Sequence, residues 1–177
     1  MKKITAFVII IVVIYSAWWM ISGGIYNNSA GEATNFTECL KSGGVVMESY
    51  PRQCRNAAGQ TFTEDIGNEL EKQNLITIDN PRPNQIITSP LSISGQARGY
   101  WFFEADFPVK IYDNNGQILG NGIAIAQDEW MTENFVPFSL KLTFDPPNTE
   151  QGTIVFEKDN PSGLSENEDS LIMPVQF

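Results

Sequence analysis

The pattern of hydrophobic and polar positions divides the chain into three parts. Residues 4–21 form an apolar run without a charged side chain. The region that follows, to about residue 74, is polar and contains only short apolar groups. From residue 75 to residue 177, short apolar segments alternate with polar positions and are separated by Gly, Pro and Asn, which is typical of half-buried β-strands.

The apolar run predicts a transmembrane anchor over residues 1–26 that contacts the bilayer through residues 4–25. At about 1.5 Å per residue the run approaches the thickness of a bilayer core. Two lysines precede it, and because such charges stay in the cytoplasm, the expected location is the cell membrane, single-pass, with the C-terminal domain extracytoplasmic. The alternative is a cleaved signal peptide, although Trp18, Trp19 and Met20 stand where small residues would mark a cleavage site.

A small module is expected after a flexible linker over residues 27–35. The module spans residues 36–65, with a helical turn at Phe36–Lys41, an extended segment at Val45–Met47 and a short strand at 60–63. A segment of this size buries little apolar surface, so it needs a covalent or metal staple.

The two cysteines of the chain, Cys39 and Cys54, predict that staple. Export favours their oxidation, and a disulfide closing about 15 residues contributes roughly 3 kcal/mol in the chain-entropy model. The spacing bears a faint likeness to Kazal-type inhibitor segments. That likeness would make Arg52, on a loop braced by the disulfide, the contact residue of a peptidase inhibitor; the alternative is a stapled cap or spacer.

The remainder predicts an all-β fold with about seven strands and no long amphipathic helix. We expect an immunoglobulin-like β-sandwich over residues 75–177, preceded by a linker or short helix at 66–74. The expected strand segments are 75–78, 86–88, 91–96, 107–112, 117–126, 138–144, 153–158 and 171–177.

The stretch 97–113 is the centre of this domain because six of its residues are aromatic, a density that suits a packed β core. Period-two alternation directs Phe107, Val109 and Ile111 inward and Lys110 outward. The following Asp-Asn-Asn-Gly sequence predicts a hairpin turn.

Charge and composition limit the chemistry. The chain has 21 acidic and 11 basic residues and a net charge of −10, which argues against nucleic-acid binding. It has no histidine, which removes Ser-His and Cys-His nucleophile pairs and histidine metal ligands. We expect no cofactor, metal or catalytic site: Glu104 and Asp106 are not placed across a recognisable pocket, and the acidic group at 166–169 lacks calcium-loop spacing.

Short motifs between residue 89 and the C-terminus carry a resemblance to a known family. They are Ser89-Pro90-Leu91, Gly95-Gln96-Ala97-Arg98-Gly99, Phe103-Glu104-Ala105, Asp113 with Gly116, Asp128-Glu129-Trp130-Met131, Asp159-Asn160-Pro161-Ser162-Gly163 and Pro174-Val175-Gln176-Phe177. With this order, residues 76–177 resemble the immunoglobulin-like domain first described in bacterial spore germination proteins. The resemblance implies an extracytoplasmic module, often coupled to membrane anchors, without a defined enzymatic activity.

Some of the matching residues are candidates for an interaction site. Arg98 and Glu104 form either a ligand-binding surface or a structural pair that caps backbone groups. Trp130 and Phe135 either present an aromatic recognition surface or pack on the rim of the sandwich. Residues 159–163 form a ligand loop or a simple turn.

The function expected from these features is that of a membrane-anchored extracytoplasmic binding or assembly module of the bacterial cell envelope, without catalysis. Its partner would be an envelope protein or the wall. The alternative is a regulator or inhibitor of an extracellular peptidase that acts through the two-cysteine module.

Overall fold

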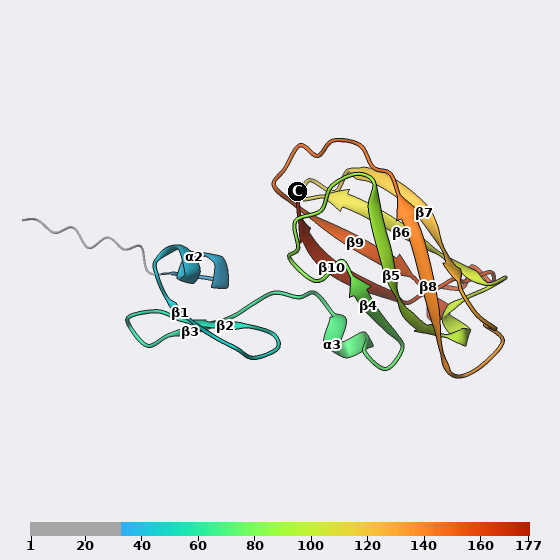
Figure 1. The fold of residues 1–177 in the computed structure, drawn as a ribbon, viewed down its shortest axis with the longest axis horizontal. Helices are drawn as coiled ribbons and strands as arrows, with labels where there is room; N and C mark the ends of the chain where they lie inside the picture. The colour runs from blue at the N-terminus through green and yellow to red at the C-terminus, as the bar shows by residue number, and fades with distance from the viewer. Residues whose placement is uncertain (1–32) are drawn as a thin grey trace, which may run out of the picture. The chain divides into compact units, whose positions relative to one another are not determined.

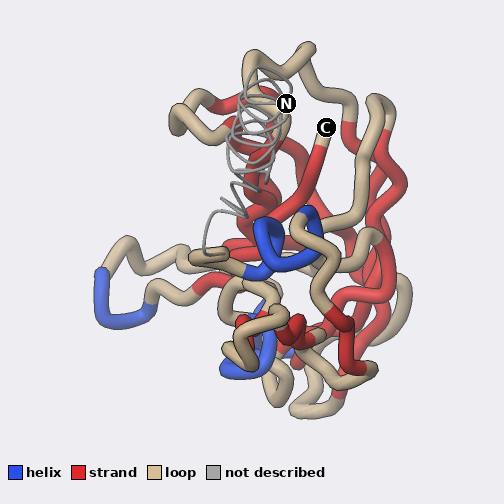
Figure 2. Tube along the Cα trace, turned by 90° about the vertical axis from the view of Figure 1, so that its left-hand side faces the viewer, coloured by secondary structure: helices blue, strands red, loops and turns tan. Residues whose placement is uncertain are grey.

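A computed structural model describes residues 33–177 (Figures 1 and 2). The chain forms two compact units, of which the first ends at Glu64 and the second spans Asp65–Phe177. The expected anchor at residues 4–25 lies outside the described residues. Within residues 33–177, none of the helices is long and apolar enough to cross a membrane.

The first unit combines one helix with a small antiparallel sheet. Helix α2 (Phe36–Lys41) is followed by strands β1 (Val45–Met47), β2 (Gln53–Arg55) and β3 (Thr61–Thr63), paired in the order β1-β2-β3. The helical turn and the extended segment are therefore confirmed. Strand β2, which contains Cys54 and is the central strand of the sheet, was not among the predicted elements.

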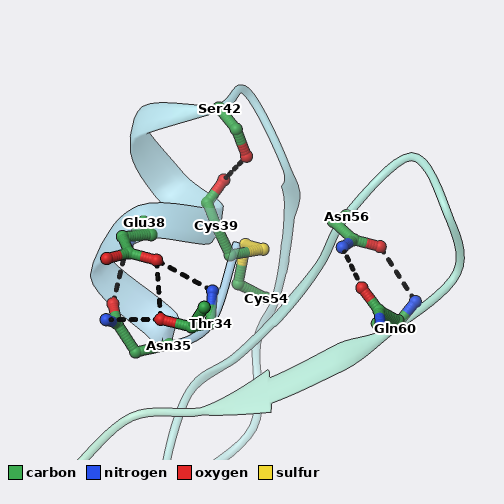
Figure 3. The surroundings of a disulfide bond; sticks show 8 residues. All are labelled: Thr34, Asn35, Glu38, Cys39, Ser42, Cys54, Asn56 and Gln60. Atoms are coloured by element: carbon green, nitrogen blue, oxygen red, sulfur yellow. Dashed lines mark hydrogen bonds between the residues drawn. A yellow bond between two sulfur atoms is a disulfide. The ribbon is translucent and has the colours of Figure 1, made fainter. Parts of the chain in front are cut away.

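The predicted Cys39–Cys54 disulfide is confirmed and lies at the centre of this unit (Figure 3). Both cysteines are fully buried, and they pack with Ala33 and Phe36. Helix α2 starts where it does because the side chain of Asn35 caps it, accepting a hydrogen bond from the Glu38 amide at 2.9 Å. Since Ala33 already belongs to the core, the ordered module begins before residue 36.

The second unit is an all-β sandwich of seven strands, as predicted. Figure 1 shows the strands in two layers, β4, β5 and β8 in one and β6, β7, β9 and β10 in the other. The strands are β4 (Ile76–Asn80), β5 (Leu91–Arg98), β6 (Asp106–Asp113), β7 (Ile118–Ala126), β8 (Phe135–Leu142), β9 (Gln151–Glu157) and β10 (Ser170–Gln176).

Hydrogen bonds connect the two layers into one continuous sheet in the order β10-β9-β6-β7-β8-β5-β4. The sheet passes from one layer to the other where β7 meets β8, and these strands pair only at Ile125–Ser139 and Ala126–Phe138. One expectation was wrong: residues 86–88 form no strand, and Ile86 makes an isolated bridge to Gln176.

The core is held by side-chain packing between the layers. Phe107, Val109 and Ile111 have no exposed surface, whereas Lys110 is half-buried on the other face, so the predicted register of β6 is confirmed. Phe107 packs edge-on against Phe138, with ring centroids 4.9 Å apart, and thereby joins the two layers.

The segment before β4 belongs to the sandwich. Residues 66–74 include the helical turn α3 (Glu69–Lys72), and Ile66 is buried. The Asn68 side chain follows the edge of β10: its amide donates to the Ser170 carbonyl at 3.0 Å, and its oxygen accepts from the Ile172 amide at 2.7 Å.

The rest of this edge is covered by residues 84–87. The Asn84 amide donates to the Pro174 carbonyl, and the Ile87 amide donates to the Gln176 carbonyl, each at 2.8 Å. Strand β10 therefore has backbone or amide partners along both sides, and the second unit has a hydrophobic core of its own.

Candidate functional site

Three connections meet at one end of the sandwich, which we call the loop end: residues 98–106, 126–135 and 157–170 (toward the lower right in Figure 1). The first connection, which contains a short 3₁₀ turn at Gly99–Trp101, bonds to both others through its backbone. The bonds are Gly99 N–H to Asn134 C=O, Ala126 N–H to Ala105 C=O, and Asp159 N–H to Trp101 C=O, at 3.1, 2.8 and 3.0 Å.

Close backbone contact at Gly99 fixes the middle loop against the first. A Cβ atom at this position would lie 2.0 Å from the Thr132 carbonyl oxygen and 2.2 Å from that of Trp130. No side chain fits there, so the loop that carries Trp130 approaches only because residue 99 is glycine.

Arg98 has a structural role at the loop end. Its Nε donates to the Asn74 carbonyl at 3.0 Å, its Nη1 donates to the Glu133 carbonyl at 3.2 Å, and its guanidinium lies 4.1 Å from the centre of the Phe135 ring. Of the two structural roles predicted for Arg98, the structure has backbone capping, with a cation–π contact in addition.

Glu104 lies in a strained two-residue hairpin turn. Phe103 and Asp106 exchange backbone hydrogen bonds at 3.1 Å, and between them Glu104 and Ala105 have φ angles of 53° and 70°. Two consecutive left-handed residues define a turn that normally selects Asn-Gly. Backbone strain of this kind concentrates at functional sites, and here it holds the Glu104 carboxylate on the surface.

Large apolar side chains are exposed around this turn. Trp130 itself is half-buried and packs against the core. Its neighbours at the loop end are more open: Tyr100 is 51% exposed, Phe103 41%, Met131 74% and Leu164 52%.

The same loops are rich in acidic residues. Residues 98–106, 126–135 and 157–170 contain ten Asp and Glu but only two basic residues, Arg98 and Lys158. The carboxylates affect one another: burial, followed by repulsion from Asp159 and Glu104, raises the pKa of Asp106 above its usual range. The loop end is therefore an acidic surface with exposed aromatic and aliphatic side chains.

A polar groove of about 680 Å³ lies beside the loop end, between α3 and the strands β6, β9 and β10. Two ion pairs lie in its lining: Lys72 is 2.5 Å from Asp169, and Lys110 is 2.7 Å from Glu157. Residues 159–163 form a local turn in which the Gly163 amide donates to the Asn160 carbonyl at 3.1 Å. Across residues 33–177, no group of three or more Cys, Asp or Glu side chains is arranged to hold a metal ion.

In the first unit, the candidate contact residue Arg52 is bound to an internal partner. Its Nε and Nη2 donate to the two carboxylate oxygens of Glu64 at 2.7 and 2.5 Å. Glu64 is buried, and this hydrogen bond raises the pKa of Arg52. The guanidinium also lies 5.4 Å from the centre of the Phe36 ring. An inhibitor that inserts an arginine into a peptidase pocket would have to break this bidentate pair.

Sequence reasoning missed several residues of the loop end. Tyr100 and Phe103 were assigned to the core because aromatic density does not distinguish buried rings from exposed ones. The clustering of acidic residues in three separate connections was a usable signal, because antiparallel strands bring alternate connections to the same end of a sheet.

The comparison with protein families identifies the second unit. The family described as the immunoglobulin-like domain of bacterial spore germination matches residues 75–165, more than half of the chain, and the chain belongs to this family. The resemblance predicted from the sequence motifs is confirmed. The family is not a known catalytic family. Neither the comparison with curated proteins nor the comparison with solved structures found a match.

Proposed function

We propose that this chain is a membrane-anchored, extracytoplasmic binding module of the bacterial cell envelope, without catalysis, and that its loop end binds a cationic segment of a partner protein. The single observation that carries the proposal is the composition of the loop end. The three connections contain ten acidic residues and only two basic ones, and four large apolar side chains are exposed among them.

The physical reasoning concerns complementarity. Exposed aromatic side chains are enriched at protein interfaces and provide contact area with little loss of side-chain entropy. Surrounding carboxylates attract a basic partner and repel an acidic one. Backbone bonds among the three connections pre-organise the surface, which lowers the cost of binding.

The anchor at residues 4–25 would keep this surface at the outer face of the membrane. The anchor is proposed because of the length of the apolar run and the two lysines before it. Mass spectrometry of the protein extracted from membranes tests the anchor: we expect residues 4–25 to be retained. A mature chain that starts between residues 22 and 30 would instead indicate a cleaved signal peptide.

Binding at the loop end is tested by photo-crosslinking in cells with the full-length chain. A photoreactive residue replaces Met131, and in a control chain it replaces Ile86, which is 67% exposed and bonded at the opposite end of the sandwich. We expect a crosslinked partner from position 131 only, and its loss when Glu104, Glu129 and Glu133 are changed to Gln.

The results separate this proposal from the peptidase-regulator alternative. A crosslinked partner with a basic segment, lost in the Gln variant, supports the proposal. Equal crosslinking in the Gln variant would refute the role of charge. If no partner is found at position 131, and the purified chain inhibits a peptidase in a way that Arg52→Ala abolishes, the regulator would replace the binding module.

A further inference from the structure

A small pocket lies at the end of the sandwich opposite the loop end, near the point marked C in Figure 1. Its volume is about 290 Å³, and we call it the end pocket. Among the described residues that line it, Asp145 alone carries a charge, and most of the others are aromatic, aliphatic or proline. The lining consists of residues 87–89, residues 144–147 and Phe177.

Contacts between segments far apart in sequence hold the end pocket in shape. The Phe144 amide donates to the Ser89 hydroxyl oxygen at 3.0 Å, which connects the two sides of the pocket. The rings of Phe144 and Phe177 pack against each other with their centroids 5.9 Å apart. The Ile87 amide donates to the Gln176 carbonyl at 2.8 Å. The pocket is therefore formed before any ligand arrives, which lowers the cost of binding.

A buried carboxylate lies at the same end of the sandwich. Asp113 is only 3% exposed. Its Oδ1 accepts hydrogen bonds from the amides of Asn115 and Gln117, each at 2.9 Å. Its Oδ2 is buried and has no hydrogen-bond partner within residues 33–177. A buried carboxylate oxygen without a donor is costly and uncommon, so this atom calls for a donor.

The register of the sheet places Asp113 next to the end pocket. Asp113 lies directly opposite Gly152 in the pairing of β6 with β9, so the two residues share a face of the sheet. A Cβ atom on Gly152 would lie 2.5 Å from two atoms of the Phe177 ring, so this ring covers Gly152. The Asp113 side chain is therefore a neighbour of the ring that lines the pocket.

We propose that the end pocket binds a small aliphatic amine in its ammonium form. The hydrocarbon part of the amine lies against the apolar lining, as the stem of a lysine side chain does on an apolar surface. The ammonium group contacts the aromatic rings of the pocket and donates a hydrogen bond to Oδ2 of Asp113. This site is separate from the loop end and is independent of the function proposed for it.

Charge and hydrogen bonding select this ligand over others. Residues 65–177 carry 17 acidic and 6 basic residues, a net charge of −11, so an anion would be repelled. A neutral apolar ligand would leave Oδ2 of Asp113 without a donor. A guanidinium group binds best to two free carboxylate oxygens, but Oδ1 is already occupied by two amides. An ammonium group acts as a point charge and needs only one oxygen.

The test is a titration of residues 65–177, a compact unit with a hydrophobic core of its own, with n-butylammonium chloride. Amide NMR at constant ionic strength follows the binding. We expect saturable shifts in residues 87–89 and at Phe144, with a dissociation constant on the order of 10 mM, which suits a ligand of about five non-hydrogen atoms. The amides of Asn115 and Gln117 should shift with the same constant, because they bond to the Asp113 carboxylate.

A matched probe and a matched pair of variants isolate the charge. The neutral analogue n-butanol should bind weaker by about tenfold or more. Asp113→Asn keeps an Oδ1 acceptor for both amides but removes the Oδ2 acceptor, and it should weaken n-butylammonium binding by about tenfold or more. Asp128→Asn makes the same change of charge at an exposed residue of the loop end and should leave the binding at the end pocket unchanged.

Each outcome decides the proposal. It is overturned if no saturable shift appears at the end pocket, or if the shifts are confined to the loop end. Equal binding of n-butanol, or tighter binding of n-butylguanidinium, also overturns it. If circular dichroism shows that Asp113→Asn is unfolded, the wild-type unit decides, because the absence of shifts at Asn115 and Gln117 refutes the contact with Asp113. A protein captured in cells through a photoreactive residue at position 86 would replace the small amine by a lysine of a partner protein.

Discussion

The strained turn at Glu104 and Ala105 gives a prediction in which one substitution has opposite effects at two positions. Ala105 has a φ of 70°, in the left-handed region, which costs an L-residue about 1–2 kcal/mol. Glycine adopts this conformation freely but loses more entropy on folding, by about 0.5–1 kcal/mol. Ala105→Gly should therefore stabilise the sandwich by about 0.5–1 kcal/mol.

Ala124→Gly is the matched control. Ala124 is fully buried on the inner side of β7, opposite Phe107. Removal of its methyl group costs about 0.8 kcal/mol of burial, and glycine in a strand interior adds about 0.5–1 kcal/mol of entropy. The same chemical change should thus destabilise the fold by about 1–2 kcal/mol at this second position.

Urea unfolding of residues 65–177, followed by circular dichroism, measures both effects. The difference between the two variants should be about 1.5–3 kcal/mol, the sum of the two estimates above. If Ala105→Gly is neutral or destabilising while Ala124→Gly behaves as expected, the turn is not left-handed at residue 105. Backbone strain would then not be what holds Glu104 on the surface.

Three further predictions use other parts of the chain. Ile111→Ala should destabilise the sandwich by about 2–5 kcal/mol because the side chain of Ile111 is fully buried. Lys110→Ala should cost about 0–1 kcal/mol, since the ion pair of Lys110 is solvent-accessible. Equal effects of the two variants in urea unfolding would contradict the register of β6. Asp106→Asn should stabilise the sandwich at pH 7, because the raised pKa of Asp106 means that the folded state disfavours its ionised carboxylate. This gain in stability should disappear as the pH falls through the pKa of Asp106. A gain in stability that stays unchanged between pH 7 and about pH 3 would show that ionisation of Asp106 is not its cause. Cys54→Ala should increase hydrogen exchange in residues 33–64 and leave residues 65–177 protected. The reason is that the disulfide links two residues of the first unit that are 15 positions apart. Increased exchange in the sandwich would show that the stabilities of the two units are coupled.

The alternation of side chains made the sandwich predictable. Phe107, Val109 and Ile111 follow the period of two that a half-buried strand requires, so both the strand and its register could be read from the sequence. The disulfide was predictable because the chain has only two cysteines. The position of β2 was not, since three residues around Cys54 form a strand only when β1 and β3 pair with them.

The candidate sites depend on contacts that no local pattern specifies. Asn68 looked like a linker residue, and its role follows from the edge of β10, more than a hundred residues away in sequence. The strand containing Ile123 was predicted, but which of its residues face the core becomes visible only from its register with β6. Likewise, the exposure of Tyr100 and Phe103 follows from the path of the loops rather than from their residue type.

The amide clamp of Asn68 on β10 has a consequence for the order in which the domain folds. The clamp joins residues 104 positions apart, and contacts of such separation form slowly because a long loop must close first. Until residues 68 and 84–87 reach it, β10 presents free amide and carbonyl groups along one side. We expect this interval, rather than any property of the finished fold, to be the period in which newly made chains are most vulnerable to intermolecular strand pairing and aggregation.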